Sequence, residues 1–145
     1  MTGNGSALPA SGKEISPVAF PAVTGGMLKE YAAASGDSNP IHLDESVAKA
    51  VGLPGIIAHG MLVAGWIGER AERFAAEVDL TGPADGPDYV LKELTTRFRA
   101  MVFLGDIISI GGVVRESGPD LVVFELQARN QKGEITTTGL ARYGR

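Results

Sequence analysis

The sequence GMLVAGWIGERAERFAAE, residues Gly60–Glu77, sets the architecture that we expect for this chain. Its first half, as far as Ile67, is apolar on every side, whereas its second half adds Glu and Arg side chains. A helix that is apolar all round has to be covered by other elements. The sequence therefore predicts a long, buried helix, and the small residues Ala64, Gly65 and Gly68 would let a sheet approach its backbone closely.

Strand-like runs follow this helix after a loop, Thr81–Asp88, that is rich in Gly, Pro and Asp. Short turn signals separate the runs, so we expect an antiparallel meander that curls around the helix. Before the helix, Pro17 and Pro21 limit Ile15–Val23 to an edge strand or an extended arm, because proline cannot donate to a central ladder. The result is an α+β architecture, whose four later strands are predicted at Tyr89–Phe98, Asp106–Arg115, Leu121–Asn130 and Glu134–Tyr143.

Two short helices are predicted between the edge strand and the long helix. Met27–Ala34 consists largely of good helix formers, and it is followed by Gly36, which is suited to a left-handed cap. Asp44 is placed to cap a second helix, Glu45–Val51. Between the two helices, Gly36–Leu43 has to be a loop because it is rich in turn residues.

Length and composition fit one folded domain. The chain has 145 residues, of which 44% are hydrophobic and 21% are charged, and these values are ordinary for a globular protein. Residues 1–12 lack periodic apolar positions, so we expect a flexible leader followed by a single domain at 13–145. The sequence shows neither a signal peptide nor an apolar run long enough to cross a membrane, so we expect a cytoplasmic protein that is not embedded in a membrane.

Charge and cysteine usage limit the partners and cofactors. The chain has 17 acidic and 13 basic residues, and its Lys and Arg residues are scattered, which argues against a nucleic-acid partner. The absence of cysteine removes disulfides, thiolate nucleophiles and cysteine-ligated metals. His42 and His59 are the only histidines, which is too few for a histidine-rich zinc site, so no metal is expected.

Groups suited to acid–base chemistry gather between Ser35 and Gly60. Asp37 and His42 lie in a loop stiffened by Pro40, so both side chains could project into one cleft and share a water. Backbone N–H groups at the start of the long helix could hold an oxyanion, and Gly60 has no side chain to block the approach. These residues also have structural explanations, because a loop aspartate is often a turn former and a lone histidine often a core or surface residue.

Neighbouring residues are better explained by structure than by chemistry. Asp44 is the better candidate for an ordinary helix cap. His59, just before the apolar helix, is expected to cap or shape that helix and not to act as a base. The Met and aromatic positions are expected to form core or to line an acyl tunnel, and they are Met61, Trp66, Phe98, Met101 and Phe103.

The segment Tyr31–Gly65, YAAASGDSNPIHLDESVAKAVGLPGIIAHGMLVAG, resembles the signature of the MaoC-like, R-specific enoyl-thioester hydratases and dehydratases. That signature is approximately Y-A-x-x-S-G-D-x-N-P-I-H-x-D, a spacer and I-A-H-G-M-L, and each of its letters is present. RFRAMVFLGD, Arg97–Asp106, resembles a second recurring stretch of the family. The resemblance covers most of the chain from about Met27 onward, and it implies a hot-dog fold, in which an antiparallel sheet wraps around a long central helix.

The resemblance also implies a role for each matching residue. Asp37 and His42 correspond to the catalytic pair, Asn39 to the residue that supports the catalytic loop, and the backbone of Gly60 to the oxyanion donor. His59 and Met61, on either side of Gly60 in the IAHGM motif, are expected to support the site or to bind substrate.

The implied reaction is the reversible addition of water to a trans-2-enoyl thioester, which gives a (3R)-3-hydroxyacyl thioester. Coenzyme A or an acyl carrier protein would carry the thioester, and no organic cofactor is implied. A hot-dog thioesterase and a non-catalytic acyl-thioester-binding or partner subunit are the alternatives. Because a single hot-dog domain leaves a sheet edge uncovered, we expect a homodimer or a heterodimer with a related hot-dog subunit.

Overall fold

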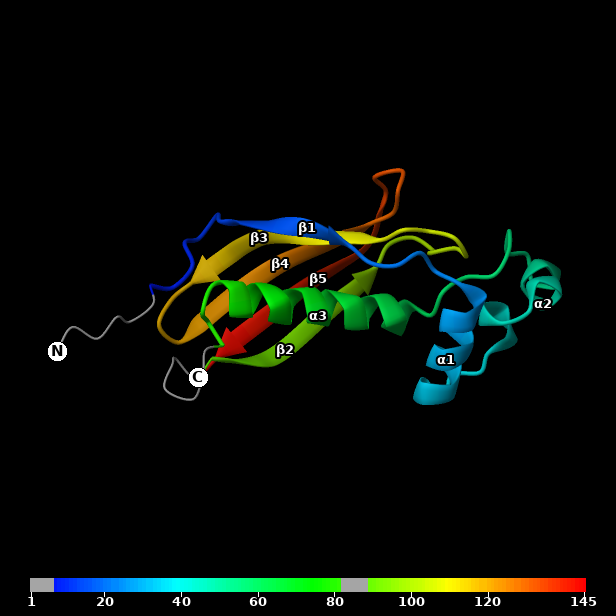
Figure 1. Cartoon of the computed structure of the whole chain (residues 1–145), viewed down its shortest axis with the longest axis horizontal. Coiled ribbons are helices and arrows are strands. Elements are labelled where there is room, and N and C mark those ends of the chain that lie inside the picture. The colour runs from blue at the N-terminus through cyan, green and yellow to red at the C-terminus, as the bar shows by residue number, and fades with distance from the viewer. Residues whose placement is uncertain (1–6, 82–88) are drawn as a thin grey trace.

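The computed structural model of the chain describes residues 7–81 and 89–145. Figure 1 shows one sheet with a long helix lying along it. Of the predicted loop Thr81–Asp88, all but Thr81 lies outside the described residues. The elements in chain order are β1 (Glu14–Ala19), α1 (Gly25–Ser35), the 3-10 helix η1 (Pro40–His42), α2 (Glu45–Ala50), α3 (Gly60–Glu77), β2 (Val90–Phe98), β3 (Ser109–Ser117), β4 (Leu121–Arg129) and β5 (Ile135–Gly144).

The helix α3 begins and ends at the residues that the sequence predicts. One face of α3 packs on the sheet, and its side chains Val63, Ile67 and Phe74 are buried. The opposite face is open in this chain: Met61 is 62% exposed, and Gly65 is exposed as well. The expectation of a helix covered on every side is therefore wrong for the single chain, in which the sheet covers one side only.

The five strands form one antiparallel sheet in the order β1-β3-β4-β5-β2. The strands β3, β4 and β5 form a meander, as predicted, but β2 pairs with β5 at the far edge and not with β3. The predicted four-strand meander is wrong at this point because residues 99–108 form a long connection from β2 at one edge to β3, which lies next to the other edge strand, β1. Ala58 donates to the Val102 carbonyl of this connection at 2.8 Å, which ties it to the segment before α3.

The strand β1 lies at the edge of the sheet, as its prolines predict. Its pairing with β3 shifts register between Ile15 and Val18. Pro17 therefore stands at an irregularity of an edge strand, where a missing N–H donor is tolerated.

Part of the predicted leader is ordered against the sheet. The Gly12 N–H donates to the Val114 carbonyl of β3 at 2.7 Å, and Leu8 packs against the hydrophobic core. A flexible leader as far as residue 12 is therefore wrong for residues 8–12, and residues 1–6 lie outside the described part of the chain.

Both short helices form close to the predicted bounds. Gly36 follows α1 with φ of 78°, in the left-handed region that favours glycine. Asp44 caps α2, as predicted, by accepting from the amides of Ser46 and Val47. The Ser46 hydroxyl also donates to Asp44 at 2.6 Å, and this bond is the main reason that the pKa of Asp44 lies below its ordinary value.

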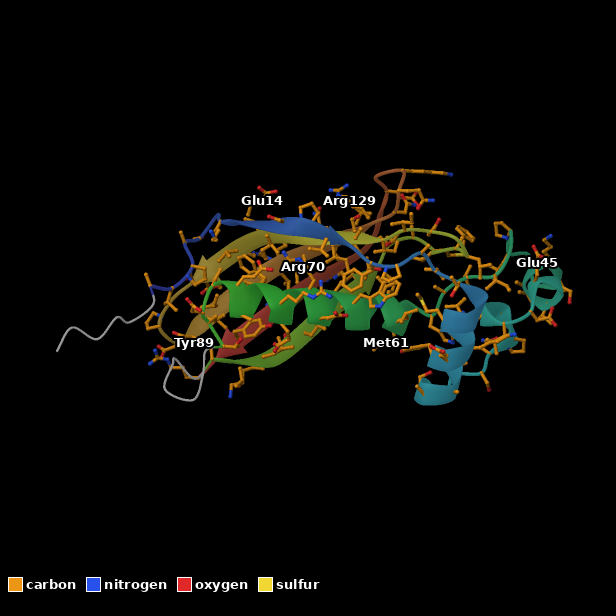
Figure 2. The ribbon with its side chains drawn as sticks, in the orientation of Figure 1. Glu14, Glu45, Met61, Arg70, Tyr89 and Arg129 are labelled. Atoms are coloured by element: carbon orange, nitrogen blue, oxygen red, sulfur yellow. The ribbon has the colours of Figure 1, made fainter. Side chains whose placement is uncertain are left out.

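Two polar side chains tie α3 to the sheet. Arg70 is buried midway along the helix (Figure 2), and its Nη2 donates to the Ser16 carbonyl of β1 at 2.8 Å. Tyr143 of β5 donates to Glu72 at 2.7 Å. Burial, and then the carboxylate of Glu72, raise the pKa of Tyr143 far above its ordinary value, so the hydroxyl keeps the proton that it donates. None of the helices in the described ranges is long and apolar enough to span a membrane.

A glycine of the sheet permits its close approach to the middle of the helix. A Cβ atom on Gly139 of β5 would lie 2.8 Å from Cγ2 of Ile67. At Gly68 a Cβ would make an ordinary contact of 3.4 Å with Leu94, and at Gly65 no atom of the described chain lies within 4 Å. The prediction that Ala64, Gly65 and Gly68 let the sheet approach is therefore wrong for Gly65, which is exposed, whereas Ala64 is buried and Gly68 lies opposite Leu94 of β2.

Replacing Gly139 by alanine is expected to lower the free energy of unfolding by about 1–3 kcal/mol, the usual cost of overfilling a packed core. The added methyl group would displace Ile67, which is fully buried. Gly65→Ala is the matched control, and it should leave stability unchanged or raise it by up to about 1 kcal/mol, because alanine favours the helix. Urea denaturation measures both variants, and equal stabilities would contradict this account.

Candidate active site

Two segments that are distant in sequence meet at one end of the molecule. Figure 1 shows the loop between α1 and α2 on the side where α3 begins. This loop carries Asp37 and His42, and it is joined to the segment before α3 by the Ile57 N–H, which donates to the Ile41 carbonyl at 3.4 Å. The fold thus brings the predicted acid–base loop beside the predicted oxyanion position.

Asp37 and His42 face each other across a short gap. Oδ2 of Asp37 lies 3.9 Å from Nε2 of His42, which is too long for a direct hydrogen bond but within the span of one bridging water. The other ring nitrogen, Nδ1, lies 2.7 Å from the carbonyl oxygen of Ile57. Because a carbonyl can only accept, neutral His42 carries its hydrogen on Nδ1, and this leaves the lone pair on Nε2, the nitrogen that lies 3.9 Å from Asp37. The His42 ring is buried, whereas the Asp37 side chain is 52% exposed.

Local hydrogen bonds shape the loop that holds the pair. Oδ1 of Asp37 accepts from the Asn39 amide, and Oδ1 of Asn39 accepts from the Ile41 amide, both at 3.2 Å. Asn39 thereby caps η1, in which Pro40 is the first residue and His42 the last. The contacts of Asn39 support the loop and do not reach the gap between Asp37 and His42.

His59 lies inside this cluster. It precedes α3, but its side chain makes no cap hydrogen bond within the described part of the chain. Its Nε2 instead lies 3.0 Å from the carbonyl oxygen of Asp37, and its ring stacks on that of His42 with centroids 3.9 Å apart. His59 thus stands at the N-cap position of α3, as expected, but its side chain makes no cap hydrogen bond with the described residues and lies instead against both members of the pair.

Gly60 opens α3 beside a small cavity. The cavity has a volume of about 180 Å³, and its lining includes His42, Gly60, Val63, Phe98 and Met101. The Phe98 ring covers Gly60 so closely that a Cβ atom there would lie 3.0 Å from the ring. The Gly60 amide belongs to the first turn of an 18-residue helix, so it has no partner within that helix and lies at the positive end of its dipole.

Met61 is not brought to this cavity. Its side chain is 62% exposed at the beginning of α3, where Figure 2 labels it. Phe98 and Met101, expected in the core or in a tunnel, line the cavity but remain 56% and 44% exposed. Trp66 stacks on Phe20 with ring centroids 5.1 Å apart, away from the pair.

The group Asp37, His42 and His59 offers three possible metal-ligand atoms within 4.8 Å of one another, which the sequence did not suggest. Its geometry does not suit a metal ion. The two imidazole planes are inclined by only 26°, so lone pairs in those planes do not converge on one point. One nitrogen of each ring also lies at hydrogen-bonding distance from a backbone carbonyl. These residues fit a shared water better than an ion.

Some neighbours of the pair could not be found from residue types. The carbonyl of Ile57 sets the tautomer of His42, and a backbone acceptor leaves no mark on the sequence. Tyr31 contacts the His59 ring edge-on, with centroids 4.7 Å apart. Tyr31 is the first residue of the motif quoted above, so the motif contains a signal for this contact. Thr137 of β5 is buried and lines the cavity.

Curated proteins of related sequence are hydratases, dehydratases and fatty acid synthases. The (R)-specific enoyl-CoA hydratase of Aeromonas caviae is 31% identical over 113 residues, which cover 77% of this chain and 78% of that protein. Fatty acid synthase 2 of Mycosarcoma maydis is 31% identical over 117 residues, or 78% of this chain, yet the chain spans only 3% of its length. The matches to three further relatives likewise cover only 2%, 17% and 5% of the lengths of those proteins.

Solved structures share the fold over nearly the whole chain. The R-hydratase PhaJ1 of Pseudomonas aeruginosa has a TM-score of 0.72 at 28% identity, covering 94% of this chain and 81% of that one. A chain of the ChsH1-ChsH2 complex of Mycobacterium tuberculosis has a TM-score of 0.77 at 18% identity, covering 93% and 97%. These likenesses confirm the predicted α+β hot-dog fold.

The family comparison agrees with the fold and with the motif. Residues 10–122 match the family described as "MaoC like domain", and this range holds the loop of Asp37 and His42, α3 and most of the sheet. Because the match extends over well more than half of the 145 residues, the chain belongs to the MaoC-like domain family.

Proposed function

We propose that this protein adds water reversibly to a trans-2-enoyl thioester and so forms a (3R)-3-hydroxyacyl thioester. The observation that carries the proposal is the 3.9 Å gap between Asp37 Oδ2 and His42 Nε2, with Nδ1 of His42 already bonded to Ile57. The hydratase and dehydratase names of several relatives support it. The cytoplasmic compartment expected from the sequence is part of the same proposal.

In the hydration direction, a water held between Asp37 and His42 adds its oxygen to the β-carbon of the enoyl group. The π electrons of the C=C bond move toward the thioester carbonyl, which becomes an enolate. The pair takes one proton from the water and returns one proton to the α-carbon, so its proton count is unchanged after one turnover. Because Asp37 and His42 act on one water at close range, the removal and the return of the proton are assigned to the pair jointly.

The Gly60 amide is proposed to receive the enolate charge. A thioester carbonyl beside the first turn of α3 would accept from an N–H group that has no partner within the helix. A side chain at this position would collide with Phe98, which explains why the position suits glycine. The apolar lining of the adjacent cavity, which includes Val63 and Met101, suits a hydrocarbon chain.

Asp37→Asn and His42→Ala are each expected to lower kcat for crotonyl-coenzyme A hydration by about 10²–10⁴-fold, the usual contribution of a positioned acid or base. The loss of enoyl absorbance measures the rate. Asp44→Asn is the matched control, because Asp44 is a nearby carboxylate that caps α2 and does not face the gap. Its rate should stay close to that of the wild-type protein.

The same assay separates the competing functions. Unchanged turnover in both the Asp37 and the His42 variants would contradict the proposal. Release of free thiol without loss of enoyl absorbance would instead indicate a thioesterase. Tight binding of the thioester without turnover by the wild-type chain, alone or with a partner, would indicate a non-catalytic subunit.

A second hot-dog chain is proposed to complete the surface around the site. The β2 edge of the sheet has no neighbouring strand among the described residues, and such an edge is a template for pairing. Phe98 and Met101 at the cavity, and Met61 at the start of α3, add exposed apolar side chains. The partner is either a second copy or a related chain, and the ChsH1-ChsH2 complex shows that some members of this fold assemble with a different chain.

Sedimentation of the purified chain is expected to give a mass of about twice the 15.1 kDa of one chain, because pairing at β2 would bury the open edge and the apolar side chains beside it. If the assembly is a heterodimer, the chain alone should sediment as a single copy and show no activity. Adding the partner chain should then about double the sedimenting mass and restore turnover. A single copy with full activity would contradict the proposed assembly.

A further inference from the structure

We infer that His59 is a positioning residue that holds Asp37, His42 and the Gly60 amide in one geometry. The inference rests on the proposed function for its catalytic meaning. Its structural part, namely that His59 fixes the His42 ring and the Asp37 backbone, can be tested without turnover.

Three contacts of His59 carry the inference. Its Nε2 lies 3.0 Å from the backbone carbonyl of Asp37, and its ring stacks on His42 at 3.9 Å between centroids. Its own carbonyl accepts from the Leu62 amide at 3.1 Å, which anchors the residue to the first turn of α3. Gly60 is the next residue in the chain. One side chain therefore connects the two members of the acid–base pair to the start of the helix.

The burial of His59 makes this arrangement stiff. The residue is 1% exposed, and the Tyr31 ring contacts it edge-on from α1, with centroids 4.7 Å apart. The groups that face the ring are Tyr31, His42 and Asp37. With contacts to α1, to η1 and to the loop before η1, the ring has little freedom to move without shifting the pair.

The hydrogen positions on His59 point to a structural and not a proton-transferring role. The Asp37 carbonyl can only accept, so Nε2 of His59 carries the hydrogen of the neutral ring. The remaining nitrogen, Nδ1, is buried and has no hydrogen-bond partner among the described residues. A proton there would be buried without an acceptor, which is unfavourable. The geometry thus offers no acceptor for a second ring proton on His59 among the described residues, and we assign proton exchange to Asp37 and His42.

Three substitutions separate the two contacts that the side chain makes. His59→Phe keeps a ring that can stack on His42 but loses the donor to Asp37. His59→Gln keeps an N–H at the reach of Nε2 but loses the stacked ring. His59→Ala loses both contacts, and the Phe and Gln variants also keep the site filled in case the alanine variant is too unstable to measure.

The kinetic measurement is crotonyl-coenzyme A hydration by these variants, with urea denaturation as the check on folding and Asp44→Asn as the control. We expect kcat of His59→Ala to fall about 100-fold, the size of effect produced by misplacing catalytic groups by about 1 Å. KM should change little, and the Phe and Gln variants should each recover part of kcat. The pH–rate profile should shift in the alanine variant, because the Asp37–His42 distance is no longer fixed.

The structural measurement is the proton NMR resonance of His42 Nδ1–H, which the 2.7 Å bond to Ile57 shelters from exchange. It should persist in the wild-type and phenylalanine proteins and broaden in His59→Ala. The inference would be overturned if the folded His59→Ala variant kept the kcat of the wild-type protein, or if only its KM changed. If the wild-type chain shows no hydration, the proposed function fails, and an unchanged His42 resonance in His59→Ala would then overturn the positioning role separately.

Discussion

The hydrogen bond between Nδ1 of His42 and the carbonyl of Ile57 is the constraint on which the site depends. Its length of 2.7 Å and the acceptor character of a carbonyl set the tautomer, so the lone pair is on Nε2, the nitrogen 3.9 Å from the carboxylate of Asp37. Ile57 is itself bridged to Phe103 in the connection between β2 and β3. The orientation of the imidazole is thus linked to the route that the chain takes from β2 across to β3.

The helix α3 connects the packing of the domain to its chemistry. Its inner face anchors the core through residues such as Ile67, and Gly139 of β5 admits that side chain to close contact. Arg70 and the Tyr143–Glu72 bond tie the helix to both β1 and β5. Because the helix is held in this way, its first turn at Gly60 is fixed beside the cavity, and a dipole of 18 residues points its positive end there.

The features that depend on residues close together in the sequence, such as helix bounds and caps, were predicted correctly. The bounds of α3 follow from its apolar half and its flanking residues, and the ends of the short helices follow from Gly36 and Asp44. The pairing of β2 with β5 was missed because strand order depends on distant partners, and the turn signals nearby fitted a simple meander equally well. The motif brought Asp37 and His42 together correctly in space, while their catalytic roles stay predictions.

The acceptors that orient the two histidines are backbone carbonyls, so no residue type in the sequence indicated them.

A direct test of the central claim uses the stereochemistry of hydration. If one water is held by one pair, the hydroxyl and the new α-hydrogen arrive on the same face of the enoyl group. Hydration of crotonyl-coenzyme A in D2O should then give a (3R) product with deuterium added syn to the hydroxyl, as read by proton NMR. Anti addition, or an equal mixture at the α-carbon, would contradict a single water shared by Asp37 and His42.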